Sequence, residues 1–197
     1  MMRRDAEIRR WQEYQSQTAH NKPRELLVRA LPYVRGKDTA LDLGAGALSD
    51  AQYLLDSGFK EVVAVDVTPQ YRELGIPKEA RFTYIESSFE QYQFEPNYFD
   101  LISSQYALPF ITKAEFSRTW EGIAKSLKGG GIFCGQLFGR HDAWSHAGSI
   151  LTHSKDEVLA LVGDSQILFL EEVERDSPTV SGTLKHWHYF DLIFKKK

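Results

Sequence analysis

Apolar residues along this chain follow two different spacings, and the two alternate. Short continuous apolar runs, bounded by Gly, Pro or charged residues, are typical of buried strands. Such runs lie at 39–43, 61–67, 81–87, 99–105, 132–139, 166–174 and 185–194. Between most of them, apolar residues recur every three or four positions, which is the spacing of a helix with one buried face. The pattern therefore predicts strands and helices in alternation.

The clearest predicted helix covers residues 112–127. Thr112 and Glu115 have the spacing of a capping box, in which each side chain bonds the backbone N–H of the other residue. The apolar stripe of this helix consists of Phe116, Trp120, Ile123 and Leu127. Ser154 and Glu157 repeat the capping box, which predicts a second helix start.

Two further helices are expected nearer the N-terminus. The segment up to about Arg35 has helical spacing, and Pro23 suits a first-turn position. After the Gly-rich turn that follows the first apolar run, Ser49 and Asp50 are candidate caps for a helix that ends at Gly58.

Alternating strands and helices are typical of an α/β fold, here a doubly wound, Rossmann-like sheet of seven mainly parallel strands. The link between the last two runs is too short for a parallel crossover, so one strand near the C-terminal edge should be antiparallel. The length fits a single domain over 1–197, with a helical cap or lid at 1–35 and a Rossmann-like core at 38–197.

Composition narrows the class of partner. The net charge is −3 with both signs interspersed, whereas a protein that binds nucleic acid is usually more basic. No apolar run approaches the roughly 20 residues that cross a bilayer, and the N-terminus lacks the apolar core of a signal peptide. Cys134 is the single cysteine. We therefore expect a cytoplasmic protein with neither a nucleic-acid nor a membrane partner.

The turn after the first apolar run is the first candidate binding site. In a doubly wound sheet, ligands bind at the carboxyl ends of the strands, where a glycine lets a ligand approach the backbone. Gly44 and Gly46 lie there, and Asp66 ends the second strand about twenty residues later. A carboxylate at that place accepts hydrogen bonds from ribose hydroxyls. The combination predicts a nucleoside site.

The residues around this turn distinguish between nucleoside cofactors. A dinucleotide places its pyrophosphate at the helix start, and a third glycine there allows close packing. Here the third glycine is replaced by Leu48, and Asp50 adds negative charge where the pyrophosphate would lie. Asp42 is a further acid just before the turn. Acids at this place favour a cofactor with cationic groups and no phosphate, such as S-adenosylmethionine.

On these motifs the chain resembles the class I S-adenosylmethionine-dependent methyltransferases, of the small single-domain kind that includes tellurite-resistance-type and small-molecule enzymes. LDLGAG at 41–46 resembles the family's first motif and VVAVDV at 62–67 the second. ESSFEQYQF at 86–94, YFDLISSQYALPF at 98–110 and LKGGGIFCGQLF at 127–138 resemble later ones. Ser88 stands where the family usually has an Asp near the adenine amino group.

The resemblance implies a set of cofactor-binding residues and a direct displacement reaction. The cofactor-binding residues are Arg24, Asp42, Gly44, Ala45, Gly46, Asp66, Val67, Ser88, Phe89 and Gln105. Arg24 would pair with the methionine carboxylate. Gln105 and Tyr106 follow the fourth strand and would lie beside the methyl group that is transferred to a small-molecule acceptor.

The six histidines raise two further questions. A histidine near the reaction centre, with His188 as the candidate, could accept a proton. No His, Cys or carboxylate spacing matches a zinc site, so we expect no metal. His186 and His188 should share one face of the last strand, with Trp187 on the other.

Two other functions fit the same sequence. One is a methyltransferase-like protein that binds the cofactor or a partner without catalysis, because Ser88 departs from the family and no general base is obvious. The other is an oxidoreductase that uses a nicotinamide dinucleotide.

Overall fold

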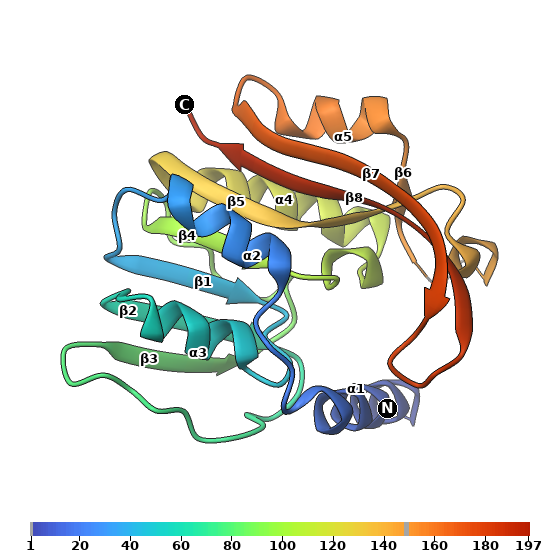
Figure 1. The fold of residues 1–197 in the computed structure, drawn as a ribbon, viewed down its shortest axis with the longest axis horizontal. Helices are drawn as coiled ribbons and strands as arrows, with labels where there is room; N and C mark the ends of the chain where they lie inside the picture. Colours follow the sequence, from blue (N-terminus) through green and yellow to red (C-terminus); the bar gives the residue numbers. More distant parts are fainter. Residues whose placement is uncertain (1, 148–149) are drawn as a thin grey trace.

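A computed structural model describes residues 2–147 and 150–197, and its centre is a twisted sheet in the order β3-β2-β1-β4-β5-β8-β7 (Figure 1). A short strand, β6, pairs with β5 off this path. The strands are β1 (Thr39–Leu43), β2 (Glu61–Asp66), β3 (Arg81–Glu86), β4 (Phe99–Ser104), β5 (Leu127–Gly139), β6 (Thr152–His153), β7 (Gln166–Pro178) and β8 (Leu184–Lys195).

The strand directions confirm the predicted fold class. The pairs β1–β2, β2–β3, β1–β4 and β4–β5 are parallel, whereas β8 runs antiparallel to both β5 and β7. The one reversed strand is therefore β8, next to the edge strand β7. The two-residue β6 is a strand beyond the expected seven.

Helices cover both faces of the sheet. The helices are α1 (Met2–Thr18), α2 (Glu25–Ala30), α3 (Ser49–Asp56), α4 (Lys113–Ser126) and α5 (Lys155–Val162), with short 3-10 turns η1 (Leu31–Tyr33), η2 (Leu108–Phe110) and η3 (Ala143–Ala147). Helices α2 and α3 lie on one face, and α4 and α5 lie on the other (Figure 1). One hydrophobic cluster fills each side, so the core has two layers.

Local signals place α4 and α5 correctly. The Thr112–Glu115 and Ser154–Glu157 capping boxes are both formed, at the first turn of α4 and of α5. Trp120 of α4 is buried against Phe133 of β5, with ring centroids 5.2 Å apart. The predicted apolar stripe is thus the face that contacts the sheet.

The N-terminal segment departs from the predicted continuous helical run. It divides into α1 and α2, and Pro23 lies in the break just before α2 rather than inside a helix. Helix α1 lies across the carboxyl ends of the central strands, away from the two helical layers (Figure 1). None of the helices in 2–147 and 150–197 has the length and hydrophobicity needed to cross a membrane.

The start of α3 also differs from the prediction. Leu48 occupies the N-cap position with φ +65°, and no side chain caps the helix. Ser49 and Asp50 instead lie in the first turn, and the Asp50 carboxylate accepts a hydrogen bond from the Arg24 backbone N–H at 2.7 Å. The expected Asp50 cap is wrong because its carboxylate accepts a hydrogen bond from Arg24, a residue distant in sequence, and not from the backbone of α3.

Candidate functional site

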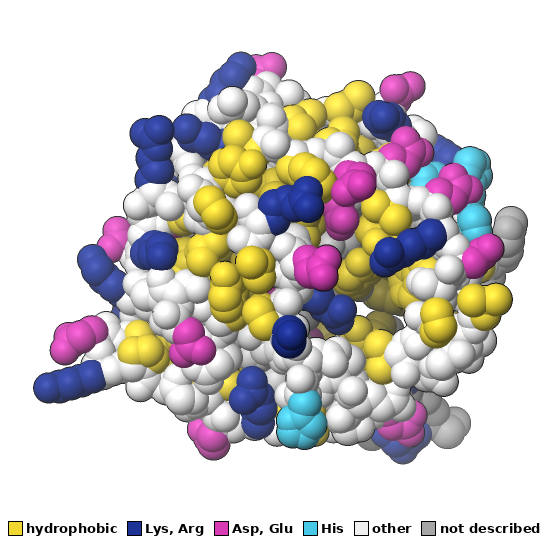
Figure 2. All heavy atoms as spheres, in the orientation of Figure 1, with side chains coloured by type: hydrophobic (Ala, Val, Ile, Leu, Met, Phe, Trp, Pro, Cys, Tyr) yellow, Lys and Arg dark blue, Asp and Glu magenta, His cyan; other side chains and the backbone are white. Residues whose placement is uncertain are grey.

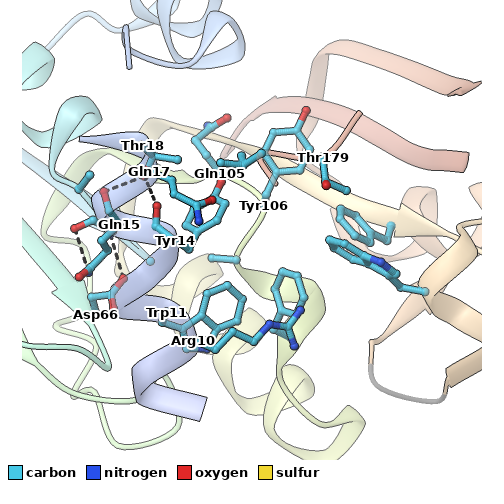
Figure 3. Close-up of a pocket in the computed structure, with 18 of the residues that line it drawn as sticks. Arg10, Trp11, Tyr14, Gln15, Gln17, Thr18, Asp66, Gln105, Tyr106 and Thr179 are labelled. Atoms are coloured by element: carbon cyan, nitrogen blue, oxygen red, sulfur yellow. Dashed lines mark hydrogen bonds between the residues drawn. The ribbon is translucent and has the colours of Figure 1, made fainter. Parts of the chain in front are cut away.

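A cavity of about 1120 Å³ opens where the carboxyl ends of β1, β2 and β4 meet α1 and the β7–β8 hairpin (Figure 3). Figure 2 shows the corresponding hollow between α1 and the hairpin, with hydrophobic side chains at its rim. The predicted residues that line it are Arg24, Gly44, Ala45, Gly46, Asp66, Val67, Ser88, Phe89, Gln105 and Tyr106. Asp42 and His188 are not among the lining residues.

The glycine turn has the conformation that its sequence predicts. Gly44 has φ +81° and Gly46 has φ +49°, in the region that favours glycine. A Cβ atom on Gly44 would lie 2.3 Å from the Ala107 Cβ atom, so this position also lacks room for a side chain. Leu48 has a left-handed conformation of the kind that favours glycine, with φ +65°, and its side chain is fully buried.

Asp66 is held in place by the turn beside it. One carboxylate oxygen accepts the Gly46 N–H at 2.9 Å. The other accepts the Thr68 N–H at 3.0 Å and the Thr68 hydroxyl at 2.7 Å. A carboxylate can accept about four hydrogen bonds, so its orientation is fixed while it keeps some capacity for a ligand hydroxyl.

Helix α1 reaches the same place through Gln15, which the sequence reasoning missed. The Gln15 amide donates to the Gly46 carbonyl at 3.1 Å and to the Thr68 hydroxyl. Figure 3 shows Gln15 on α1 close to Asp66. Gln15 is buried by these contacts. No local motif marks this glutamine, because its partners lie 31 and 53 residues away.

Two buried acids and one arginine set the charge behind the turn. Burial raises the pKa of Asp42 well above its ordinary value, and Asp50 and Asp66 raise it further. Burial also raises the pKa of Asp50, while its hydrogen bond with the Arg24 backbone opposes the shift. The Arg24 guanidinium donates to the Tyr14 hydroxyl at 2.9 Å and lies 5.4 Å from the Tyr106 ring centroid. A cation bound at this end of the cavity would favour the ionised forms of these acids, and the Arg24 guanidinium would favour a bound anion such as a carboxylate.

Among the described residues, five buried side-chain polar atoms have no hydrogen-bond partner, and three of them belong to predicted site residues: Asp42 Oδ2, Ser88 Oγ and Gln105 Oε1. Ser88 and Gln105 line the cavity. An unpaired buried polar atom is costly, so a ligand with polar groups at these places would stabilise the site. The glycine turn, Asp66 and these atoms fit a nucleoside with cationic groups.

Tyr106 lies between the end of the cavity formed by the glycine turn and the far end, which is lined by aromatic rings. Its backbone has φ +56°, and its N–H donates to Gln136 Oε1 at 3.1 Å. Burial raises the pKa of Tyr106, and its hydrogen bond with Tyr189 adds to the shift. The hydroxyl therefore stays protonated, and its single hydrogen is directed to Tyr189.

The far end of the cavity is lined by aromatic rings that surround a lysine. Trp144 of η3 and Trp187 of β8 have ring centroids 5.5 Å apart. The Lys185 ammonium lies 3.6 Å from the Trp187 centroid and 4.2 Å from the Trp144 centroid. It also pairs with the fully buried Asp142. A lysine on a strand usually faces solvent, so the sequence offered no sign of this burial.

His188 does not occupy the place expected of a base. Its Nδ1 accepts the His141 backbone N–H at 3.0 Å, and its Nε2 lies 3.1 Å from a Glu172 oxygen. Both ring nitrogens are thus engaged outside the cavity, while Trp187 and Tyr189 of the same strand line it. Trp187 therefore lies on the cavity side and His188 does not, but His186 also lines the cavity, so the predicted shared face of the two histidines does not decide which of them reaches it.

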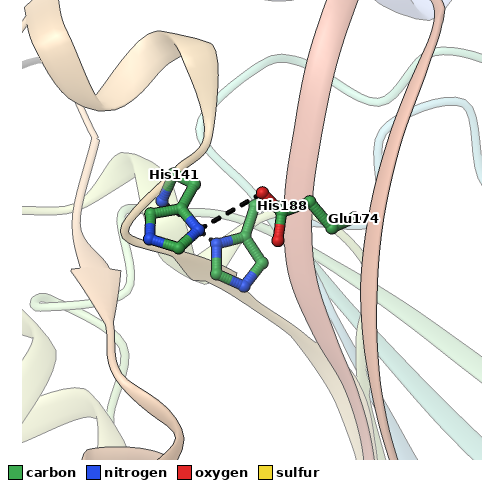
Figure 4. A group of neighbouring side chains, drawn as sticks. All are labelled: His141, Glu174 and His188. Atoms are coloured by element: carbon green, nitrogen blue, oxygen red, sulfur yellow. Dashed lines mark hydrogen bonds and ion pairs between the residues drawn. The ribbon is translucent and has the colours of Figure 1, made fainter.

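The histidines also lie closer together than their spacing in the sequence suggests. His141, His188 and Glu174 offer ligand atoms within 4.8 Å of one another (Figure 4). His141 Nδ1 lies 3.2 Å from Glu174 Oε1, and His186 Nε2 lies 3.1 Å from the same oxygen. These contacts are hydrogen-bonded pairs, and the absence of a metal site stays a prediction.

The sequence of the core matches a known family. Residues 41–135 match the family of methyltransferase domains. An uncharacterized methyltransferase of Synechocystis sp. is 32% identical over 96 residues, which cover 47% of this chain and 43% of that protein. The match thus spans less than half the length of this curated relative.

Solved structures share the fold at low sequence identity. TehB from Haemophilus influenzae has a TM-score of 0.72 at 16% identity, over 87% of this chain and 61% of that chain. The 1,6-didemethyltoxoflavin N1-methyltransferase of Burkholderia thailandensis, solved with 1,6-didemethyltoxoflavin and S-adenosylhomocysteine, has a TM-score of 0.61 at 19% identity, over 88% and 77%.

Proposed function

Because the chain carries a class I S-adenosylmethionine-dependent methyltransferase domain, whose cofactor is S-adenosylmethionine, we propose that it methylates a small-molecule acceptor by direct displacement. The observation that carries the proposal is Asp66, fixed by Gly46 and Thr68 at the edge of a cavity with unpaired polar atoms. When bound, the cofactor supplies a methyl group on a cationic sulfur, which keeps the electron pair as the methyl leaves.

Each predicted residue has a proposed role in holding that cofactor. Asp66 accepts hydrogen bonds from the ribose, and Ser88 with Phe89 contacts the adenine. Ala45 and Val67 provide backbone contacts, and Arg24 pairs with the methionine carboxylate. Asp42 contributes negative charge from behind the turn.

Gln105 and Tyr106 are proposed to orient the acceptor beside the methyl group. Alignment of reacting groups in a dry site supplies much of the rate of a displacement, so no covalent residue is needed. The segment 1–35 would act as a lid on the core at 38–197, because α1 lies over the strand ends and Gln15 contacts Gly46. A cavity closed in this way suits a small acceptor, and the structural neighbour from Burkholderia thailandensis was solved with the small molecule 1,6-didemethyltoxoflavin.

Cofactor binding tests the proposal directly. Calorimetry should show S-adenosylhomocysteine bound to the wild type. Asp66→Ala should lose about 2–4 kcal/mol of binding free energy through lost charge-assisted hydrogen bonds. Asp164→Ala, an exposed acid after α5, is the matched control and should bind normally. Unchanged affinity in Asp66→Ala would reject the ribose role.

Turnover tests the reaction itself. The protein is incubated with S-adenosylmethionine carrying a radiolabelled methyl group and with a metabolite fraction free of macromolecules. Label should move to small molecules. Parallel incubations receive a protein fraction or an RNA fraction in place of the metabolites. Label that moves only to protein or RNA in those incubations would contradict the small-molecule acceptor.

The second candidate function is cofactor binding without catalysis. It is favoured by the placement of His188 outside the cavity, which removes the expected base. Tight cofactor binding with no transfer to any acceptor class would support it. A nicotinamide dinucleotide fits less well, because Leu48 and Asp50 occupy the helix start where its pyrophosphate would bind.

A further inference from the structure

The far half of the cavity presents aromatic faces. Tyr106, Phe110, Phe138, Trp144 and Trp187 form a continuous set, with neighbouring ring centroids 5.5–6.2 Å apart. Four of these side chains are partly exposed, and all five line the cavity. Aromatic rings pack favourably against a further ring, in offset-stacked or edge-to-face arrangements.

A single ion pair lies within this aromatic set. The Lys185 side chain is 3% exposed and pairs with Asp142, which is fully buried. Asp142 also accepts the Trp144 N–H at 3.0 Å and the His188 N–H at 3.2 Å. Both oxygens of Asp142 are therefore hydrogen-bonded and the residue is fully buried, while Lys185 lines the cavity.

The ammonium keeps donor capacity that the pair does not use. A lysine has three N–H donors, and the hydrogen bond to Asp142 takes one of them. The other two lie among ring faces 3.6–5.0 Å away, which attract a cation but offer no lone pair. A ligand oxygen or nitrogen would supply what the rings do not.

The charge of this ligand follows from the balance of the pair. Lys185 and Asp142 together are neutral, and both are removed from water. An anionic ligand would add a second negative charge to one ammonium, and a cationic ligand would be repelled by it. Burial of either charge without its own partner is costly.

Resting on the proposed function, we propose that this half of the cavity binds an uncharged, flat aromatic acceptor, and that Lys185 donates a hydrogen bond to a lone pair on its rim. The rings of Trp144 and Trp187 contact the acceptor plane. Lys185 then selects among aromatic acceptors, whereas the residues that bind the cofactor make the same contacts whichever acceptor is bound.

A series of naphthalenes with the same ring system and different charge tests the proposal by calorimetry, with and without S-adenosylhomocysteine. The probes are 2-naphthol, its apolar isostere 2-methylnaphthalene, anionic 2-naphthoate and cationic 2-naphthylmethylamine. We expect 2-naphthol to bind at least tenfold more tightly than the other three. Equal or tighter binding of a charged analogue, or no binding of any member of the series, would overturn the proposal.

Two variants separate the two parts of the proposal. The double variant K185M/D142N removes both charges and avoids an unpaired buried acid. It should reduce 2-naphthol binding to the level of 2-methylnaphthalene. Trp144→Leu should weaken both ligands by a similar factor. Lys125→Met, at an exposed lysine of α4, is the control. A double variant that keeps the preference for 2-naphthol refutes the role of Lys185.

The cofactor titration distinguishes this proposal from the proposed function. Binding of S-adenosylhomocysteine to wild type and to K185M/D142N should be the same, because Lys185 lies in the aromatic half. If S-adenosylhomocysteine binds and the naphthalene series shows no preference, only the acceptor class is wrong. If S-adenosylhomocysteine does not bind the wild type, the proposed function fails. The naphthalene titrations without S-adenosylhomocysteine then still show whether the aromatic half binds an uncharged ring.

Discussion

Replacement of Gly44 by alanine should lower the free energy of unfolding for two reasons, one in the backbone conformation and one in the space around the residue. The first reason is the backbone: φ is +81°, and a left-handed conformation costs a residue with a Cβ atom about 1–2 kcal/mol. The second is space, because the new Cβ atom would lie 2.3 Å from the Ala107 Cβ atom. Ordinary contact begins near 3.4 Å, so something must move by about 1 Å. Overpacking of this kind costs about 1–3 kcal/mol.

Gly46 provides the matched comparison. It also has positive φ, at +49°, but the nearest atom to its Cβ position lies 3.9 Å away. Gly46→Ala should therefore cost only the backbone part, about 1–2 kcal/mol. Gly44→Ala should cost about 2–5 kcal/mol of unfolding free energy, the sum of both parts.

The assay is urea unfolding followed by far-UV circular dichroism, with the slope against urea checked for constancy. The double variant Gly44→Ala/Ala107→Gly removes the overlap and should regain about 1–3 kcal/mol, after allowance for the cost of a new glycine. Equal losses in Gly44→Ala and Gly46→Ala, or no recovery in the double variant, would refute the steric argument and leave only the backbone cost.

Three further predictions concern the same turn. Leu48→Ala should lose about 2–5 kcal/mol of stability because the Leu48 side chain is fully buried. In urea unfolding, Leu48→Gly should be about 1 kcal/mol more stable than Leu48→Ala, because φ at this position is +65°. If the alanine variant is instead the more stable of the two, the prediction is wrong. Burial raises the pKa of Asp42 and Asp50, so in weak acid both are partly protonated, and a cationic cofactor must displace those protons. Affinity for S-adenosylmethionine should therefore rise as the pH is raised from 5 to 8, a range that lies above the ordinary carboxyl pKa of about 4. In calorimetric titrations, Asp42→Asn should flatten this rise. Gln15→Ala removes two hydrogen bonds between α1 and the strand ends, so stopped-flow measurements should show faster entry and faster exit of S-adenosylhomocysteine; unchanged rates would argue against a lid.

Features determined by neighbouring residues were predictable from the sequence. The capping boxes at Thr112 and Ser154 involve residues three positions apart, and both form. The one reversed strand follows from the short link between the last two apolar runs. The positive φ angles of Gly44 and Gly46 follow from their place in a tight turn after a parallel strand.

Features determined by distant contacts were not predictable. Gln15 reaches Thr68 across 53 residues, and Lys185 reaches Asp142 across 43. Alternation placed His188 and Trp187 on opposite faces of β8, but only the curvature of the hairpin decides which face meets the cavity. A buried ion pair among aromatic rings leaves no periodic signal in a sequence.

The glycine turn at the cofactor end of the cavity and the hairpin part of its aromatic wall come from different parts of the chain. The turn and acid proposed to hold the cofactor lie between residues 42 and 89, whereas Lys185 and Trp187 lie on the long β7–β8 hairpin that extends past the sheet (Figure 1). Substitutions in the hairpin therefore alter the aromatic wall without touching the strand ends at Gly44 and Asp66. Such a division lets selection exchange one acceptor for another while the donor chemistry is inherited intact, and it makes the hairpin the segment to graft or randomise in an engineered enzyme.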